Sequence, residues 1–380
     1  MKKLLCMLLA ALMVLTMASF AMAEEAASYK IAVMTGTTSQ GEEEPTTAAK
    51  LVETYGAGKV LYDTYPDNFS SEVETTISKL IAFASDPDVK AIIFVQGVQG
   101  AVSAFTQIKE SMGRDDILLI AGVPAEDPAD ISAAADIVLA VDEIGCGYQV
   151  ADKAAEWGCD VLVHYSFARH LSYETIVAKR DAMKMTAEGY GIEFVQRDCP
   201  DPTGDAGMSG AQAAVLEDVP KVMQEYAGKK VCFYCTNCGI QVALQQAVLA
   251  AGDDAYYALP CCPSPFHGYQ EAFGLDATYG DIEGAITNLA NFLNESGAAG
   301  RFSTWAIPVN MSMINASYEY ACAYAEGKIE KVDEAFLTEC FSEAAGSEAI
   351  LGKYTNATGE ELANYYLIQF SPIDFNDYIG

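Results

Sequence analysis

The chain has 380 residues, of which 51% are apolar and 20% charged, and its 53 acidic residues against 22 Lys and Arg give a formal net charge of −31. This length is typical of two globular domains, and the apolar content is too high for a disordered chain. The negative charge repels phosphate backbones, which argues against nucleic acid as a partner.

The first 23 residues have the pattern of a secretory signal peptide. Lys2 and Lys3 precede an apolar run that ends at Met22, and Ala21 and Ala23 are the small residues that signal peptidase requires. A retained anchor of about 19 apolar residues is the alternative. Cleavage before Glu24 fits the small residues and the acidic start of the body better. We therefore predict an exported, extracytoplasmic protein whose mature body carries a charge of −33.

Strand and helix patterns then alternate along the chain. In the first half, strands are predicted at Tyr29–Met34, Val60–Tyr65, Val89–Val95, Ile117–Ala121 and Asp136–Val141, with helices at 43–55, from Ser70 or Ser71, and at 101–112. The pattern restarts with strands at Asp160–Tyr165, Ile192–Arg197, Lys230–Cys235 and Ala255–Leu259, and helices at 149–157, 172–190, 211–226 and 240–251. Continuous apolar runs are typical of strands covered on both faces. The predicted fold class is therefore α/β, with two doubly wound parallel-sheet lobes.

The domain boundaries follow from this restart. We expect lobe 1 to comprise residues 24–142 with about 280–309, and lobe 2 to comprise 143–279 with about 310–380. Hinge strands are expected near Val141–Gly147 and again between about Thr278 and Val309. A strand at Phe302–Ile307 is expected to cross between the lobes, and helices are expected at 282–293 and 312–327.

The predicted ligand site lies at the carboxyl ends of the strands, in the cleft between the lobes, because loops and helix N-termini converge there. The candidate residues of lobe 1 are Thr35, Thr37, Thr38, Gln96, Gly97 and Glu126, and those of lobe 2 are Tyr165, Ser166, Arg169, His170, Asn237, Ser264 and His267. Such side chains suit a small polar solute. For each of them a turn or cap role is the alternative.

Arg169 is the most suggestive of these residues. It follows a strand and comes just before the expected helix cap Ser172, in a chain with few cations. A guanidinium in that place predicts a ligand with carboxylate, phosphate or polyol oxygens. The alternative is an ion pair with one of the 53 acids.

Ten cysteines follow the leader, and Cys232, Cys235 and Cys238 form a C-x2-C-x2-C pattern before Cys261-Cys262. This spacing resembles thiolate metal or iron–sulfur motifs. Cys232 and Cys235, however, are three apart in a strand and should point to opposite faces. Only Cys235 and Cys238 could converge with Cys261 or Cys262. We favour a disulfide or free thiols there, predict no cofactor and no metal, and keep a thiolate metal or iron–sulfur protein as a weaker alternative.

Enzyme motifs are missing from the sequence. It has no G-x-S-x-G, H-E-x-x-H or G-x-x-x-x-G-K-[ST] pattern, and His164 lies inside an apolar strand, as core histidines do. We predict no catalysis. A transcription regulator with two lobes would need a helix-turn-helix and a basic face, which this charge does not offer.

The signal peptide, the two doubly wound lobes and the polar strand ends together resemble a type I periplasmic solute-binding protein, over roughly residues 28–330. The segments 163–170 (VHYSFARH), 235–238 (CTNC) and 261–268 (CCPSPFHG) are similar to an uncharacterised secreted branch of that superfamily. In many members a strand ends in a ligand-binding Asn-Asp pair; Asn237 matches the Asn, and Cys238 replaces the acid. Arg180 resembles the arginine that many members aim at a ligand, with a surface helix charge as the alternative.

The resemblance implies a monomer that closes by hinge motion on a small polar solute and delivers it to an ABC permease at the membrane. A ligand sensor that presents the bound molecule to a membrane signalling receptor is the alternative, because both functions use the same cleft closure.

Overall fold

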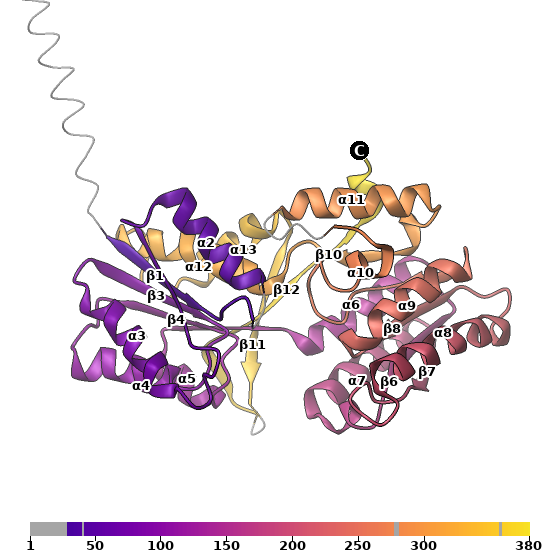
Figure 1. The fold of residues 1–380 in the computed structure, drawn as a ribbon, viewed down its shortest axis with the longest axis horizontal. Helices are drawn as coiled ribbons and strands as arrows, with labels where there is room; N and C mark the ends of the chain where they lie inside the picture. The colour runs from indigo at the N-terminus through magenta and orange to yellow at the C-terminus, as the bar shows by residue number, and fades with distance from the viewer. Residues whose placement is uncertain (1–28, 40–41, 277–280, 357–358) are drawn as a thin grey trace, which may run out of the picture.

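Two α/β lobes lie side by side in the computed structural model, which describes residues 29–39, 42–276, 281–356 and 359–380 (Figure 1). The predicted signal peptide lies outside the described residues. None of the helices in the described part of the chain combines the length and apolar character that a bilayer span requires.

Lobe 1 is built on a seven-stranded sheet in the order β11-β12-β5-β4-β3-β1-β2. Its strands are β1 Lys30–Thr35, β2 Val60–Thr64, β3 Val89–Val95, β4 Leu118–Gly122, β5 Ile137–Val141, β11 Ala349–Thr355 and β12 Glu361–Phe370. All neighbours are parallel except the β11–β12 hairpin. The continuous apolar runs are buried on both faces, as expected for a parallel sheet.

Helices cover both faces of this sheet. The helices of lobe 1 are α2 Glu43–Tyr55, α3 Val73–Ser85, α4 Ala101–Thr106 with a π-helical turn Gln107–Ser111, α5 Pro128–Ala134, α12 Val309–Ala325 and α13 Glu334–Ala345. Successive side chains of a strand point to opposite faces of the sheet and therefore pack against different helices. Ile31 and Val33 of β1 share a core with α2, α12 and α13, whereas Ala32 and Met34 share one with α3, α4 and α5.

Lobe 2 is built on a four-stranded parallel sheet in the order β7-β6-β8-β9. Its main elements are α6 Glu143–Glu156, β6 Val161–Ser166, α7 Glu174–Gly189, β7 Glu193–Asp198, α8 Gly207–Glu225, β8 Val231–Cys235, α9 Cys238–Ala251 and β9 Ala255–Tyr257. Helix α6 packs against α7, and α8 packs against α9. The shorter elements are α10 Tyr269–Phe273, α11 Ile282–Glu295, β10 Ser303–Trp305, β13 Pro372–Asp374 and a 3-10 turn Phe375–Tyr378. The fold class predicted from the sequence is confirmed.

The chain passes between the lobes three times: after β5, between β10 and α12, and between β12 and β13. The first passage differs from the expected hinge strand at Val141–Gly147. Asp142 already caps α6 by accepting from the N–H of Gly145 at 2.7 Å, so the link is short. The strand expected at Phe302–Ile307 exists as β10, and the chain crosses directly after it.

The expected assignment of the later segments to the lobes was wrong. Residues 282–305 pack into the core of lobe 2, and residues 309–370 pack into lobe 1. The reason lies in the pairing of β12, which extends the parallel sheet of lobe 1 by aligning Tyr365 with Val138 of β5. That contact joins segments more than 200 residues apart, and local periodicity carries no trace of it.

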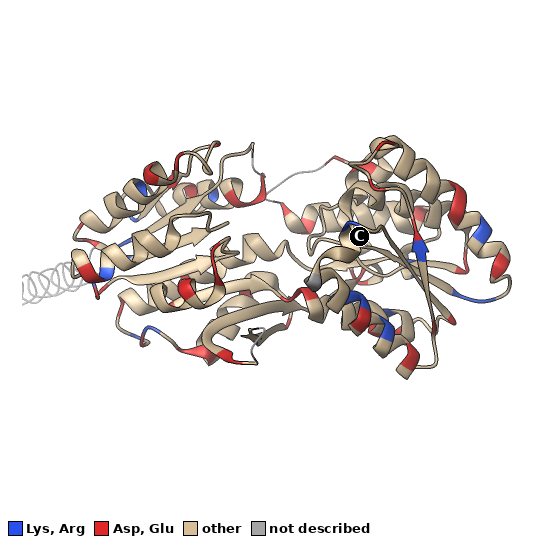
Figure 2. Cartoon of the chain, turned by 90° about the horizontal axis from the view of Figure 1, so that it is seen from below, with Lys and Arg blue, Asp and Glu red and all other residues tan. Residues whose placement is uncertain are grey.

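Acidic residues are spread over helices and loops of both lobes (Figure 2). The negative charge is therefore a property of the whole surface, not of one site.

Candidate functional site

The carboxyl ends of the two sheets face each other. In lobe 1 the chain leaves the end of β5 directly for lobe 2. In lobe 2 the loop after β9 reaches back: the carbonyl of Pro263 accepts from the N–H of Val309 at 3.1 Å, and Ser264 Oγ donates to Glu43 Oε1 at 2.8 Å. Glu43 opens α2, the helix that follows β1. The strand-end loops of both lobes therefore border the region between the lobes, as the sequence predicted.

Two residues of the lobe 1 rim have strained backbones. Gln96, just after β3, has φ 57°, and Val123, just after β4, has φ 47°. Positive φ is costly for a non-glycine residue, and most of all for a β-branched one. The strain is held by strong local bonding, since Val123 N–H donates to Leu139 O at 2.7 Å and Gly97 N–H donates to Gly122 O at 3.0 Å. Strained strand ends of this kind are a feature of binding sites.

Of the lobe 1 candidates, Gln96 and Thr38 are the best placed to contact a ligand. The Gln96 Oε1 accepts from Tyr65 OH at 3.1 Å, which leaves its amide NH₂ available, and Thr38 is exposed. Thr37 bonds Ser39 Oγ at 2.7 Å and the Asp67 carboxylate.

Two lobe 1 candidates serve their own lobe. Thr35 is fully buried and bonds Tyr62 OH at 3.1 Å. Glu126 accepts from the N–H groups of Gly100 and Val102, at 3.2 and 2.8 Å, and so caps α4. This is the cap role that the sequence left open.

Two lobe 2 candidates are likewise internal. Tyr165 is 1% exposed and donates to Asp218 Oδ2 on α8 at 2.9 Å, because its side chain points away from the strand end into the helix layer. Ser166 is fully buried and shares a 2.8 Å hydrogen bond with Thr236, which ties the ends of β6 and β8 together. The ligand role expected for Tyr165 is therefore not supported.

The two candidate arginines have intramolecular partners. Arg169 makes a bidentate contact with Asp201, at 2.6 and 2.9 Å, and donates to Tyr173 OH at 3.3 Å. This contact holds the pKa of Asp201 well below its ordinary value. Arg180 pairs with Asp181, its neighbour on α7. Arg169 therefore has the alternative role stated for it, an ion pair with an acid, and Arg180 has the alternative stated for it, a surface helix charge.

His170 and Asn237 connect two strand-end loops of lobe 2. Asn237 caps α9 by accepting from the N–H of Gly239 at 2.9 Å, and its Nδ2 lies 3.3 Å from His170 Nε2. The His170 ring packs on Phe167 at 4.3 Å between centroids. Burial, and then the charge of Arg169, lowers the pKa of His170, so the ring is neutral at pH 7.

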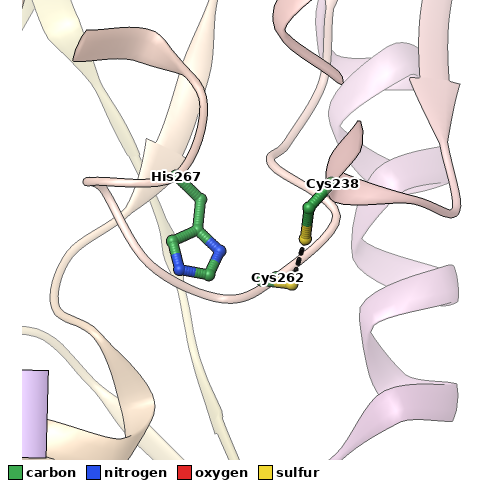
Figure 3. A group of neighbouring side chains, drawn as sticks. All are labelled: Cys238, Cys262 and His267. Atoms are coloured by element: carbon green, nitrogen blue, oxygen red, sulfur yellow. Dashed lines mark hydrogen bonds between the residues drawn. The ribbon is translucent and has the colours of Figure 1, made fainter. Parts of the chain in front are cut away.

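A thiol–imidazole cluster of Cys238, Cys262 and His267, whose ligand atoms lie within 4.8 Å of one another, lies beside this rim (Figure 3), and Cys261 adjoins it. The Sγ atom of Cys238 is 2.8 Å from that of Cys262 and 3.2 Å from that of Cys261, and the two adjacent cysteines are 3.9 Å apart. The convergence of Cys238 with Cys261 and Cys262 was expected from strand geometry. None of the ten cysteines in the described part of the chain forms a disulfide.

The pKa values of Cys238 and His267 are shifted in opposite directions. Contacts with Cys261 and Cys262, and then with His267, lower the pKa of the Cys238 thiol, which also starts α9, where the helix dipole favours a thiolate. Burial alone would lower the pKa of His267, but Cys238 and Cys262 outweigh it and raise that pKa to about 11.

Glu43 was missed by the sequence analysis. Its carboxylate lies 3.9 Å from His267 Nε2, accepts from Ser264, and has a pKa raised by burial. It stands in the run Glu42-Glu43-Glu44, one of many acidic stretches, and only the contact with Ser264 distinguishes it. A cavity of about 440 Å³ adjoins the cluster, and its lining includes Cys238, Gln241 and His267.

Residues 29–303 match the model of the family described as "Protein of unknown function (DUF3798)". The chain belongs to this family. A protein of Treponema pallidum (strain Nichols), described only as an uncharacterized protein, is 38% identical to this DUF3798 chain over 182 residues, which cover 46% of the chain and 81% of that protein. A second protein of the same strain is 36% identical over 178 residues, covering 46% and 79%.

Solved structures share the fold of the DUF3798 chain. A candidate transcriptional regulator from Clostridium difficile 630 matches with a TM-score of 0.82 and 20% identity, over 91% of this chain and 99% of that one. A sugar ABC transporter from Actinomyces odontolyticus ATCC 17982 matches with a TM-score of 0.52 and 10% identity, over 80% and 86%. The fold is that of type I periplasmic binding proteins, as the sequence predicted.

Proposed function

We propose that the protein is an extracytoplasmic solute-binding protein that takes a small polar ligand into the cleft between its lobes and delivers it to an ABC permease. The observation that carries this proposal is the pair of strained residues, Gln96 and Val123, at adjacent strand ends of lobe 1. Both residues lie at the carboxyl ends of lobe 1 strands, and three chain segments link this lobe to lobe 2. Such a link allows hinge closure around a ligand.

The chemistry of the rim favours an uncharged ligand. Arg169, the cation expected to bind an anionic group, is already paired with Asp201. Outside the cluster that holds His267, the available candidates are uncharged donors and acceptors: the Gln96 amide, the Thr38 hydroxyl and the His170 ring, whose pKa is lowered by burial. A sugar or another polyol suits these groups. The fold shared with a sugar ABC transporter agrees with that ligand class.

The first experiment is mass spectrometry of small molecules that co-purify with the mature protein. Protein stripped of ligand is then screened by thermal shift against neutral sugars, polyols and nucleosides, since a ligand bound only by the folded state raises the Tm. A compound that raises the Tm and compacts the protein in small-angle scattering supports hinge closure. If no compound of these classes does so, the proposal of a neutral polar solute is wrong.

A variant at Gln96 then tests the site. Gln96→Gly removes the amide and also suits the positive φ, so we expect affinity for the identified ligand to fall about tenfold without loss of stability. Gln107→Ala is the control, because that amide bonds Ser103 within the helix segment after β3. Equal affinity of the two variants would remove Gln96 from the site.

Transport and sensing share this cleft. Uptake of the labelled ligand by cells that lack this protein separates the two functions: uptake falls if the protein feeds a permease and is unchanged if it only presents the ligand to a receptor.

A further inference from the structure

We propose that Cys238, Cys262 and His267, with Cys261 beside them, form a binding site for a thiophilic metal ion, with Zn²⁺ the best fit. The proposed ligands all belong to lobe 2, and the proposal does not rest on solute binding in the cleft. Two thiolates and one imidazole are a ligand set that binds zinc with a fourth position left open for water or another ligand.

The distances between the sulfur atoms are close to those that one ion requires. Two sulfurs bound to a tetrahedral zinc lie about 3.7 Å apart, given Zn–S bonds of about 2.3 Å. The observed distances from Cys238 to Cys261 and between Cys261 and Cys262 are 3.2 and 3.9 Å. The Cys238–Cys262 distance of 2.8 Å must widen by roughly 1 Å. Cys238 is exposed and Cys262 is half-buried, so both side chains have room to adjust.

The orientation of His267 suits it to be the imidazole ligand. One of its ring nitrogens lies within 4.8 Å of the Sγ atoms of Cys238 and Cys262. Its Nε2 is near Glu43, whereas its Nδ1 is buried and has no hydrogen-bond partner among the described residues. Figure 3 shows a ring nitrogen turned toward the two thiols. A metal ion would satisfy this buried nitrogen.

The supports around the cluster are those of a metal site. Glu43 is placed to orient the His267 ring from the side opposite the thiols, as carboxylates do for metal-bound histidines. The backbone of the cysteine loop is fixed from α9, where Gln241 Oε1 accepts from the N–H of Cys261 at 2.7 Å and from Tyr257 OH at 3.1 Å. The adjoining cavity gives an ion access to the cluster.

A disulfide explains this arrangement less completely. It would use two of the three thiols and leave the third thiol and the buried His267 nitrogen without a partner. An ion uses Cys238, Cys262 and His267 at once, and the proton of each thiol and of the imidazolium that binds it is released to the solvent.

The test uses the mature protein, reduced and free of metal, without a histidine tag. Co²⁺ serves as the spectroscopic probe, because tetrahedral thiolate coordination gives it intense visible and charge-transfer absorption, and Zn²⁺ competition then gives the zinc affinity. We expect one equivalent to bind. Loss of an outer-shell partner costs about 10–100-fold in affinity, so Cys238→Ser, which removes a ligand, should cost more than about 100-fold.

The matched control is Cys322→Ser, a half-exposed thiol on α12 of lobe 1, which should leave the affinity unchanged. Glu43→Gln should weaken Co²⁺ binding about 10–100-fold at an unchanged Tm in the metal-free state, which a purely structural role would not produce. Alkylation of the wild-type protein is a readout that needs no variant: Zn²⁺ should protect Cys238 and Cys262.

Three results would overturn the proposal. One is the absence of stoichiometric Co²⁺ binding by fully reduced wild-type protein. Another is equal affinity in Cys238→Ser and Cys322→Ser. The third is alkylation of Cys238 and Cys262 at the same rate with and without Zn²⁺.

Discussion

The two lobes share one architecture but differ in their chemistry. Lobe 2 contains all three histidines, both tryptophans and eight of the ten cysteines that follow the predicted leader, whereas lobe 1 has only Cys322 and Cys340 of these residues. Lobe 1 shapes its rim with backbone, through the strained residues Gln96 and Val123. Lobe 2 shapes its rim with titratable and nucleophilic side chains. The difference suggests that lobe 1 gives the cleft its form and that lobe 2 gives the protein its sensitivity to pH, oxidants and metals.

The largest effect that separates the lobes is expected from one closely packed glycine in each lobe. A Cβ on Gly147 of α6 would lie 2.4 Å from the carbonyl oxygen of Lys179 on α7, which cannot move alone. A Cβ on Gly122 of β4 would meet the side chains of Val95 and Met313, at 3.1 and 3.3 Å, and these can adjust. We expect Gly147→Ala to lower the free energy of unfolding by about 3 kcal/mol and Gly122→Ala by about 1 kcal/mol.

Urea unfolding checks this pair of values. Tryptophan fluorescence reports lobe 2, because Trp157 and Trp305 both lie there, and circular dichroism reports both lobes. Gly189→Ala is the control, since a Cβ added there at the end of α7 would have no atom within 4 Å, and it should be neutral or stabilising by up to about 1 kcal/mol. Equal costs at Gly147 and Gly122 would contradict the close packing of α6 on α7.

An effect of intermediate size is expected from His164 in the core of lobe 2. Its Nδ1 lies 2.7 Å from Gln196 Oε1, its ring stacks on Phe194 and Tyr234, and burial lowers its pKa to about 4. The unfolded chain, with a histidine pKa of about 6.5, binds the proton first. The contribution of the neutral His164 ring to the free energy of unfolding is therefore fully present above the unfolded pKa of about 6.5. It falls as the pH drops from about 6.5 toward 4, and about 2 kcal/mol is lost at pH 5.

His164→Phe keeps the ring stack and removes this titration. Unfolding followed by tryptophan fluorescence at pH 7 and pH 5 should show that the wild type loses about 2 kcal/mol more than the variant. An identical loss in both proteins would mean that other groups cause the acid sensitivity of lobe 2.

Features that depend on local sequence patterns could be predicted from the sequence, and features that depend on long-range pairing could not. Buried strands were predictable because a run such as Val89–Val95 has no other stable place than a covered sheet. The edges facing the cleft were predictable too, since strand ends in parallel sheets converge. The lobe membership of 282–305 and 309–370 was not, because it depends on the pairing of β12 with β5 across the chain.

Individual roles at the site were harder to predict than its position. Asp201, which occupies Arg169, is one of 53 acids, and no local pattern marks it. The strain at Val123 is invisible in a residue type that favours strands. By contrast, the convergence of Cys238 with Cys261 and Cys262 followed from the period of two in strands, which places Cys232 on the other face.

The smallest effect is expected where the two lobes touch. Ser264 Oγ of lobe 2 donates to Glu43 Oε1 of lobe 1 at 2.8 Å. Ser264 Oγ also accepts from the N–H of Phe266 at 3.1 Å. Ser264→Ala removes a donor from a mostly buried carboxylate, so we expect a loss of about 1 kcal/mol in the free energy of unfolding at pH 7. Ser85→Ala is the control, because that exposed hydroxyl bonds only Ile81 O within α3, and its cost should stay below about 0.5 kcal/mol. If the two serine variants lose the same stability, the Ser264–Glu43 contact between the lobes contributes nothing in the unliganded protein.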